Sequence, residues 1–285
     1  MKNALKLLTL LCIAFILLNS AAGSFGGALR VVLQCFAFAL PVVIGYVASR
    51  RFKREREEIA GVAESESTLF ELSRSSLREF LPTVAPTVAV IFLLSYLTSL
   101  LLGALGMTGN TVEDAPLYEM ILLHALIPSV LEEMLFRYLP MKLLAPYSRR
   151  ACVIISSLYF AVVHMSLYQL PYAFAAGLIF IIIDLACESV LPSVILHFIN
   201  NTVSVLFIKY GENPDFALWF VIIMVALALV SLIPIIIRRK EYIESVRRAL
   251  LKGEGIGELF APGVFTVMCV LLSILNTLTF GGANG

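Results

Sequence analysis

Charged residues are scarce in this chain of 285 residues: Asp, Glu, Lys and Arg together make up 14% of it. Histidine is rarer still, with three copies, and there is one tryptophan. A soluble globular domain usually has about a quarter of its residues charged, so the composition excludes that class. The net charge of +1 comes from nearly balanced acidic and basic residues. It gives no indication of a nucleic-acid partner.

The sequence also lacks the usual signatures of metal and disulfide sites. It contains no C-x-x-C pair and no H-E-x-x-H motif, the spacings by which zinc sites are recognised. The five cysteines all lie within or at the ends of apolar stretches, so we expect buried thiols. They are Cys12, Cys35, Cys152, Cys187 and Cys269.

Long apolar runs dominate what is present. Hydrophobic residues make up 60% of the chain, and the mean hydropathy is +0.93. A run of about 20 apolar residues is long enough to cross a bilayer as a helix. The sequence therefore predicts an all-α, polytopic transmembrane bundle of eight or nine spans. The candidate spans lie near residues 4–22, 27–49, 82–104, 117–145, 150–168, 170–188, 190–209, 215–237 and 263–281.

The first candidate span has two interpretations. Lys2 and Lys6 precede an apolar run that ends in small residues at 19–23, a pattern that also fits a cleaved signal peptide. We favour a retained helix, which gives nine spans, whereas cleavage would leave eight. The topology of the later spans is the same in either case.

The distribution of lysine and arginine predicts the orientation. Of the 21 basic residues, all but Arg30, Arg137 and Lys209 fall in the N-terminus, in the loops at 50–81 and 238–262, or around the turn at 146–149. Basic residues concentrate on the cytoplasmic side of membrane proteins. We therefore expect these segments, the N-terminus included, to face the cytoplasm of a multi-pass cell-membrane protein.

Two of the cytoplasmic segments are expected to form helices in the headgroup region. Thr68 and Glu71 fit a capping box before an amphipathic stretch that reaches Phe80, and residues 241–252 separate apolar from basic positions. We expect both helices to contact membrane lipids.

The span at 117–145 contains three charged residues, Glu132, Glu133 and Arg137, in otherwise apolar surroundings. Each ionised side chain near the bilayer centre costs roughly 2.5–3.5 kcal/mol on insertion scales, and such residues usually mark function. Glu133 and Arg137 are four positions apart and are expected to pair along the helix. Glu132 is rotated by roughly 100°, which leaves its carboxylate free to act.

The three histidines all fall in candidate spans. His124 lies near the outer end of its span, where a solvated or structural role is expected. Counted from the turn at Ser148, Glu132 and His164 are equally distant on neighbouring antiparallel helices, so they lie at similar depth.

His197 shares a helical face with Asn201 but is close in sequence to the turn near Ser189. It reaches the depth of Glu132 if that turn is sunk into the protein. The alternative is that the fourth and fifth helices project into the cytosol.

Three motifs thus follow one another on successive candidate helices. They are Glu132-Glu133-x-x-x-Arg137, Phe160-x-x-x-His164 and His197-x-x-x-Asn201. Over roughly residues 117–205 the chain resembles the CPBP family, which comprises CAAX-type intramembrane endopeptidases and related bacteriocin-processing or immunity proteins. In this order, inside apolar segments, the motifs form a specific match.

The resemblance implies a glutamate-dependent protease that needs no metal or other cofactor. Its active-site chamber would lie in the membrane and open toward the cytosol. By carry-over from the family motifs, Glu132 would activate a water with help from His164. The substrate would be a membrane-associated or lipidated peptide or protein.

The other motif residues are implied to position the site and to bind the intermediate. Glu133 and Arg137 would orient the site or substrate, and His197 and Asn201 would stabilise the oxyanion. On this basis we divide the single membrane domain into residues 1–116 (N-terminal helices and the amphipathic segment), 117–209 (a catalytic helical core) and 210–285 (C-terminal helices).

Two other functions remain open from the sequence. One is a membrane metalloprotease in which Glu132, His164 and His197 bind zinc. The other is a non-catalytic scaffold or immunity protein that binds a partner through the polar cavity. The sequence does not identify the substrate or the oligomeric state.

Overall fold

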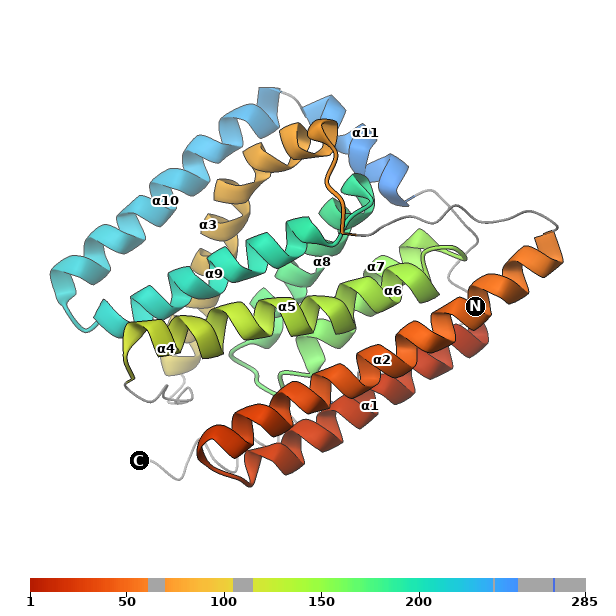
Figure 1. The fold of residues 1–285 in the computed structure, drawn as a ribbon. Coiled ribbons are helices and arrows are strands. Elements are labelled where there is room, and N and C mark those ends of the chain that lie inside the picture. Colours follow the sequence, from red (N-terminus) through yellow and green to blue (C-terminus); the bar gives the residue numbers. More distant parts are fainter. Residues whose placement is uncertain (61–69, 105–114, 238, 251–268, 270–285) are drawn as a thin grey trace.

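The computed structural model describes residues 1–60, 70–104, 115–237, 239–250 and 269 (Figure 1). Within these residues the chain is helical and contains no β-strand, which confirms the all-α fold class. The elements in chain order are α1 (Lys2–Gly23), α2 (Gly27–Ala60), α3 (Arg74–Ala104), α4 (Leu117–Ile121), η1 (Leu122–Leu126), α5 (Ile127–Glu133), η2 (Met134–Tyr138), α6 (Leu139–Leu143), α7 (Arg149–Val162), α8 (Leu170–Cys187), α9 (Leu191–Tyr210), α10 (Pro214–Ile237) and α11 (Arg239–Leu250).

Helices α1 and α2 form a hairpin at one side of the bundle (Figure 1). The chain reverses just before Gly27, whose φ of +57° favours glycine. α2 continues beyond the predicted end at residue 49 through a charged segment. There, Arg51 and Glu55 form an i,i+4 ion pair of 3.8 Å, which supports an exposed helix.

Helix α3 differs from the prediction of a short interfacial helix followed by a separate span. It runs without a break from Arg74 to Ala104, although two prolines lie inside it. Ser73 caps it by accepting a hydrogen bond from the Ser76 backbone N–H at 3.0 Å, while Thr68 of the predicted capping box lies outside the described residues. A continuous helix satisfies its own backbone groups, which an apolar environment demands.

The segment from Leu117 to Leu143 is helical throughout, but two stretches of it, η1 and η2, are π-helical. Figure 1 shows α4, α5 and α6 in line as one rod. π-helical turns inside α-helices are rare and frequently mark functional sites. Here they flank α5, which ends in the two glutamates.

Helix α7 is shorter than the predicted span at 150–168, because it ends at Val162. The chain then turns, and Met165 adopts a φ of +50°. A side chain in this left-handed region is uncommon and costs about 1–2 kcal/mol. The shortening places His164 in a connection rather than on a helix, which corrects the prediction.

Six helices of the described part are long and apolar enough to cross a membrane: α1, α2, α3, α8, α9 and α10. These elements make the protein a polytopic membrane bundle. The predicted spans at 117–145 and 150–168 correspond to the segmented rod and to the shortened α7. The candidate span at 263–281 lies, apart from residue 269, outside the described residues.

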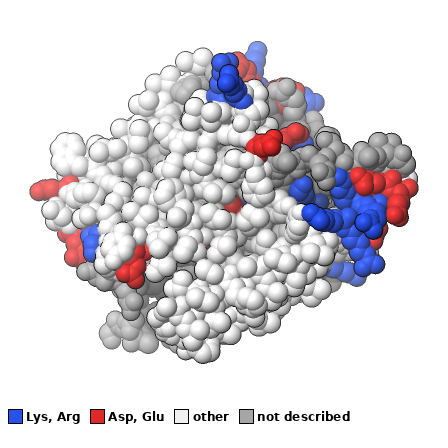
Figure 2. Space-filling view, viewed as in Figure 1, with Lys and Arg blue, Asp and Glu red and all other residues white. Residues whose placement is uncertain are grey.

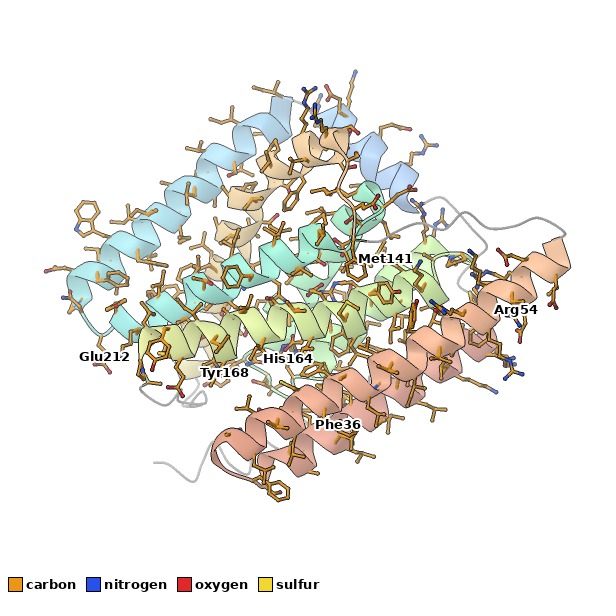
Figure 3. The ribbon with its side chains drawn as sticks, in the orientation of Figure 1. Phe36, Arg54, Met141, His164, Tyr168 and Glu212 are labelled. Atoms are coloured by element: carbon orange, nitrogen blue, oxygen red, sulfur yellow. The ribbon has the colours of Figure 1, made fainter. Side chains whose placement is uncertain are left out.

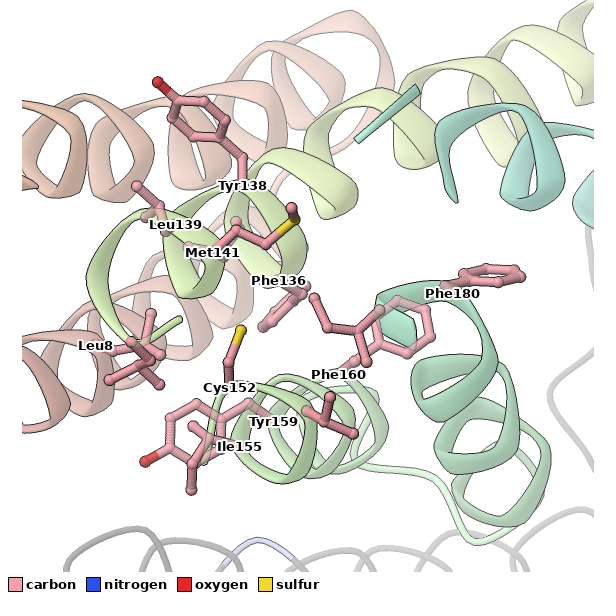
Figure 4. Packing of buried hydrophobic residues seen from close by; sticks show 14 of the residues in the cluster. Leu8, Phe136, Tyr138, Leu139, Met141, Cys152, Ile155, Tyr159, Phe160 and Phe180 are labelled. Carbon is pink, nitrogen blue, oxygen red and sulfur yellow. The ribbon is translucent and has the colours of Figure 1, made fainter. Parts of the chain in front are cut away.

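The second predicted amphipathic segment is a helix, α11, which packs against the ends of α7 and α8. Helix α9 lies at the centre of the bundle, where it contacts α3, α4, α5, α8 and α10. The main hydrophobic core lies between α1, α6, α7 and α8 (Figure 4). Four of the five cysteines are buried thiols, as expected, and Cys35 is partly buried.

Charged side chains gather at the two ends of the molecule and leave a broad uncharged belt between them (Figure 2). Arg54 lies at one end and Glu212 at the other (Figure 3). The α1 N-terminus, the end of α2 and the α6–α7 turn all lie toward the Arg54 end (Figure 1). These three segments, which the basic residues assigned to the cytoplasm, thus share one end of the bundle.

Candidate active site

Five of the six predicted site residues converge halfway along the bundle, where Figure 3 labels His164. The rod supplies Glu132, Glu133 and Arg137 from α5 and η2, the turn after α7 supplies His164, and α9 supplies His197. Three separate parts of the chain therefore build one polar cluster inside the uncharged belt.

Glu133 and Arg137 form the predicted pair. Arg137 Nε lies 3.3 Å from Glu133 Oε2, and both side chains are completely buried. The guanidinium also lies over the ring of Phe160, 4.3 Å from its centroid, and 5.7 Å from the Phe180 centroid. A buried cation needs such compensation because its desolvation is expensive.

His197 is bound to this pair. Its Nδ1 lies 2.7 Å from Glu133 Oε1. A carboxylate that faces Arg137 accepts hydrogen bonds, so Nδ1 carries the proton and donates it to Glu133. The ring is thereby oriented with Nε2 toward Glu132, 3.9 Å from its Oε2. The sequence did not predict this bond between His197 and Glu133.

His164 is oriented by a different group. Its Nδ1 lies 2.6 Å from the carbonyl oxygen of Phe160. The carbonyl has no proton to give, so Nδ1 donates, and in the neutral imidazole the lone pair is then on Nε2. That Nε2 lies 3.8 Å from Glu132 Oε2, as the equal-depth argument predicted. The i,i−4 relation to Phe160 persists although His164 lies beyond the end of α7.

Glu132 therefore lies between two imidazole nitrogens and forms no ion pair with Arg137 in the part of the chain that the structure describes. Its side chain retains 17% exposure, whereas Glu133 retains none. Separations of 3.8 and 3.9 Å are too long for direct hydrogen bonds. They leave Glu132 available for a water or a substrate atom.

The turn between α8 and α9 explains how His197 reaches this level. Ser189 and Val190 in that turn are completely buried. The start of α3 covers it, since Cys187 Sγ lies 4.0 Å from the Ser76 carbonyl oxygen. Glu188 of the same turn is exposed and pairs with Arg149 at 3.3 Å. Of the two alternatives left by the sequence, the burial of Ser189 and Val190 favours a turn sunk into the protein.

Asn201 and His124 are not joined to the cluster. Asn201 is partly buried one turn beyond His197, and among the described residues no hydrogen bond connects its side chain to the glutamates or histidines. His124 is exposed on η1, as expected for a solvated position.

Sequence reasoning missed a further buried carboxylate next to the cluster. Asp184 on α8 is completely buried and interacts electrostatically with Glu133 and Arg137. The only sequence signal is one acidic residue in an apolar run, Ile181-Ile182-Ile183-Asp184-Leu185. Such a residue in a span is a functional candidate by default.

The described residues contain no group of three or more His, Cys, Asp or Glu side chains arranged to hold a metal ion.

Residues 115–203 match the sequence model of a family described as Type II CAAX prenyl endopeptidase Rce1-like. The matched segment contains all three motifs. No curated protein and no solved structure matches the chain. The family match confirms the resemblance to CPBP proteins that the three motifs indicated.

Proposed function

We propose that this chain, whose residues 115–203 match the Rce1-like type II CAAX prenyl endopeptidase family model, is an intramembrane endopeptidase that uses Glu132 to activate water. The observation that carries the proposal is the position of Glu132. Its carboxylate faces two imidazoles, each oriented by a hydrogen bond at Nδ1, in the middle of an uncharged belt.

In the first step, Glu132 accepts a proton from a water as the water oxygen attacks the peptide carbonyl carbon. Neutral His164 assists by accepting a hydrogen bond from the same water at Nε2, while its Nδ1 donates to the Phe160 carbonyl oxygen. General bases of this kind contribute about 10²–10⁴-fold to rate.

In the second step, the tetrahedral intermediate places negative charge on the former carbonyl oxygen. His197, held by its hydrogen bond with Glu133, and the Asn201 amide donate hydrogen bonds to this oxygen. Glu133 and Arg137 hold the His197 ring in this direction. Glu132 then returns its proton to the leaving amine, and the peptide bond breaks.

The substrate is a peptide or membrane protein, lipidated or not, that reaches the cluster from within the membrane. The basic end of the bundle faces the cytoplasm, in keeping with the distribution of lysine and arginine. The surrounding belt contacts membrane lipids. Exposed apolar side chains on α10, such as Leu218, Trp219 and Ile222, fit this environment.

The proposal is tested by comparing wild type with Glu132→Ala and His164→Ala on the peptides of its membrane proteome. His124→Ala is the matched control, because His124 is an exposed histidine outside the cluster. We expect a set of cleaved peptides that wild type and the control produce and the other two variants do not.

If no peptide depends on Glu132 or His164 while a membrane partner still co-purifies, the chain is a binding scaffold and the protease proposal is wrong. Metal analysis of the purified protein, with activity measured after chelation, tests the zinc alternative. Loss of activity on chelation and its return with zinc would favour that mechanism.

A further inference from the structure

Asp184 is a completely buried carboxylate on α8 for which the proposed reaction has no role so far. Its Oδ1 accepts a hydrogen bond from the Ser193 backbone N–H at 3.0 Å. Its Oδ2 forms no hydrogen bond within the described residues. A buried carboxylate with an unsatisfied oxygen is costly, so its presence requires an explanation.

The bond to Ser193 completes the N-terminus of α9. The first N–H groups of a helix lack partners inside the helix. In α9 the Leu191 N–H bonds to Ser189 Oγ at 3.2 Å, Pro192 has no N–H, and the Ser193 N–H is left for Asp184. The cap thus comes from the preceding helix, which fixes α9 against α8.

The capped residue lies on the helix that carries His197. Ser193 lies four positions before His197, so the two share a face of α9. The Ser193 hydroxyl donates a hydrogen bond to the Val190 carbonyl oxygen at 2.9 Å, which ties this residue to the turn before α9. A shift of α9 at Ser193 would therefore move His197 relative to Glu133 and Glu132.

We propose that Asp184 is a positioning residue. The hydrogen bond that it accepts from the Ser193 N–H fixes the position of α9, so that His197 can form its hydrogen bond with Glu133. The role rests on the proposed function, because it concerns the alignment of the same reaction. The role is assigned to the hydrogen bond that Oδ1 accepts, and the variants below separate it from a role of the carboxylate charge.

Three variants separate this role from a general loss of stability. Asp184→Ala removes the acceptor, whereas Asp184→Asn keeps an oxygen at the Oδ1 position. Ser148→Ala is the matched control: Ser148 is equally buried and caps the third residue of α7, accepting from the Ala151 N–H at 3.3 Å. It removes a cap of the same kind from a helix end away from the cluster.

Two measurements are made on each purified full-length variant. The first is kcat and KM on a peptide identified by the proteome comparison. The second is the ¹⁵N NMR signal of the His197 ring, assigned with His197→Gln, which reports the hydrogen bond at Nδ1 without turnover.

We expect Asp184→Ala to lower kcat at least about tenfold with KM little changed, because small misplacements of reacting groups are costly. Its His197 Nδ1 signal should lose the hydrogen-bonded shift. Asp184→Asn should stay within about threefold of wild-type kcat and keep the signal. Ser148→Ala should lower the thermal stability, because it removes a helix cap. It should leave both kcat and the His197 Nδ1 signal unchanged.

The proposal is overturned if Asp184→Ala keeps both kcat and the His197 signal, or if Ser148→Ala shows the same losses. It is also overturned if Asp184→Asn is as impaired as Asp184→Ala, since the charge would then be the essential property. If wild type hydrolyses nothing, the proposed function fails and the His197 signal alone decides the role of Asp184.

Discussion

Glu132 and Glu133 are neighbours in sequence but have different surroundings. Glu133 is completely buried and holds both Arg137 and His197. Glu132 has no ion pair with Arg137 among the described residues. It faces the other nitrogen of His197 at 3.9 Å and keeps part of its surface exposed. The rotation of roughly 100° between adjacent helical residues produces this division. The Glu133 carboxylate is occupied by contacts that hold the site together, and the Glu132 carboxylate remains available to react.

Replacing Arg137 tests the structural half of this division. Arg137→Met leaves the Glu133 charge buried without its cation, which typically costs about 3–5 kcal/mol of unfolding free energy. The measurement is equilibrium unfolding in mixed micelles. The double variant Glu133→Gln/Arg137→Met should recover part of the loss, because it removes both charges.

The control for that experiment is Arg51→Met, which breaks an i,i+4 pair of the same kind at an exposed position. Exposed pairs contribute little, so its stability should be close to wild type. Equal effects at Arg51 and Arg137 would show that burial of the Glu133–Arg137 pair has no energetic consequence.

The site could be predicted from the sequence only where both partners have a recognisable spacing. Glu133 and Arg137 are i,i+4 on one helix, and Glu132 and His164 are symmetric about one turn. Asp184 was not predicted because its hydrogen-bond partner is a backbone N–H on the next helix. A backbone partner leaves no pattern in the sequence. The bond between His197 and Glu133 joins residues 64 positions apart and depends on the buried α8–α9 turn.

Among the elements, the close approach of α7 and α8 positions Phe160 and His164. An ideal Cβ built on Gly177 would lie 2.9 Å from the Cα of Ser157, closer than real contacts allow. The atom it meets is backbone, so no side-chain rotation relieves the clash. Small residues let membrane helices pack this closely.

Gly177→Ala should therefore push α7 from α8 and lower the unfolding free energy by about 1–3 kcal/mol, as overpacking does. The measurement is unfolding in mixed micelles. Gly103→Ala is the matched control, because a Cβ there meets nothing within 4 Å. It should be neutral or slightly stabilising, since alanine favours helices. A Gly177→Ala variant as stable as Gly103→Ala would contradict the packing account.

Element boundaries were harder to predict than element existence. The apolar runs identified α1, α8, α9 and α10 closely, because length and hydropathy determine them. The runs did not indicate that α7 stops at Val162 or that α3 continues through the interfacial segment. Both outcomes depend on packing and backbone conformation, such as the positive φ of Met165, which composition does not encode.

For the molecule as a whole, the separation of charge into two ends predicts its orientation in the membrane. Cysteines introduced by Glu55→Cys and Glu212→Cys, in a Cys35→Ser background, would sit at opposite ends on exposed positions. An impermeant maleimide should label the cysteine at 212 in intact cells and the one at 55 only after permeabilisation. The reverse pattern would invert the proposed orientation.

The central claim is that Glu132 is the base that activates water. Its most direct test is kcat of purified Glu132→Gln on a cleaved peptide, with peptide affinity measured in parallel. Glu119→Gln serves as control, since Glu119 is exposed on the same helical rod. The account predicts a loss of about 10²–10⁴-fold in kcat with affinity retained, and no loss for the control. A Glu132→Gln enzyme that keeps more than about a tenth of wild-type kcat would contradict it.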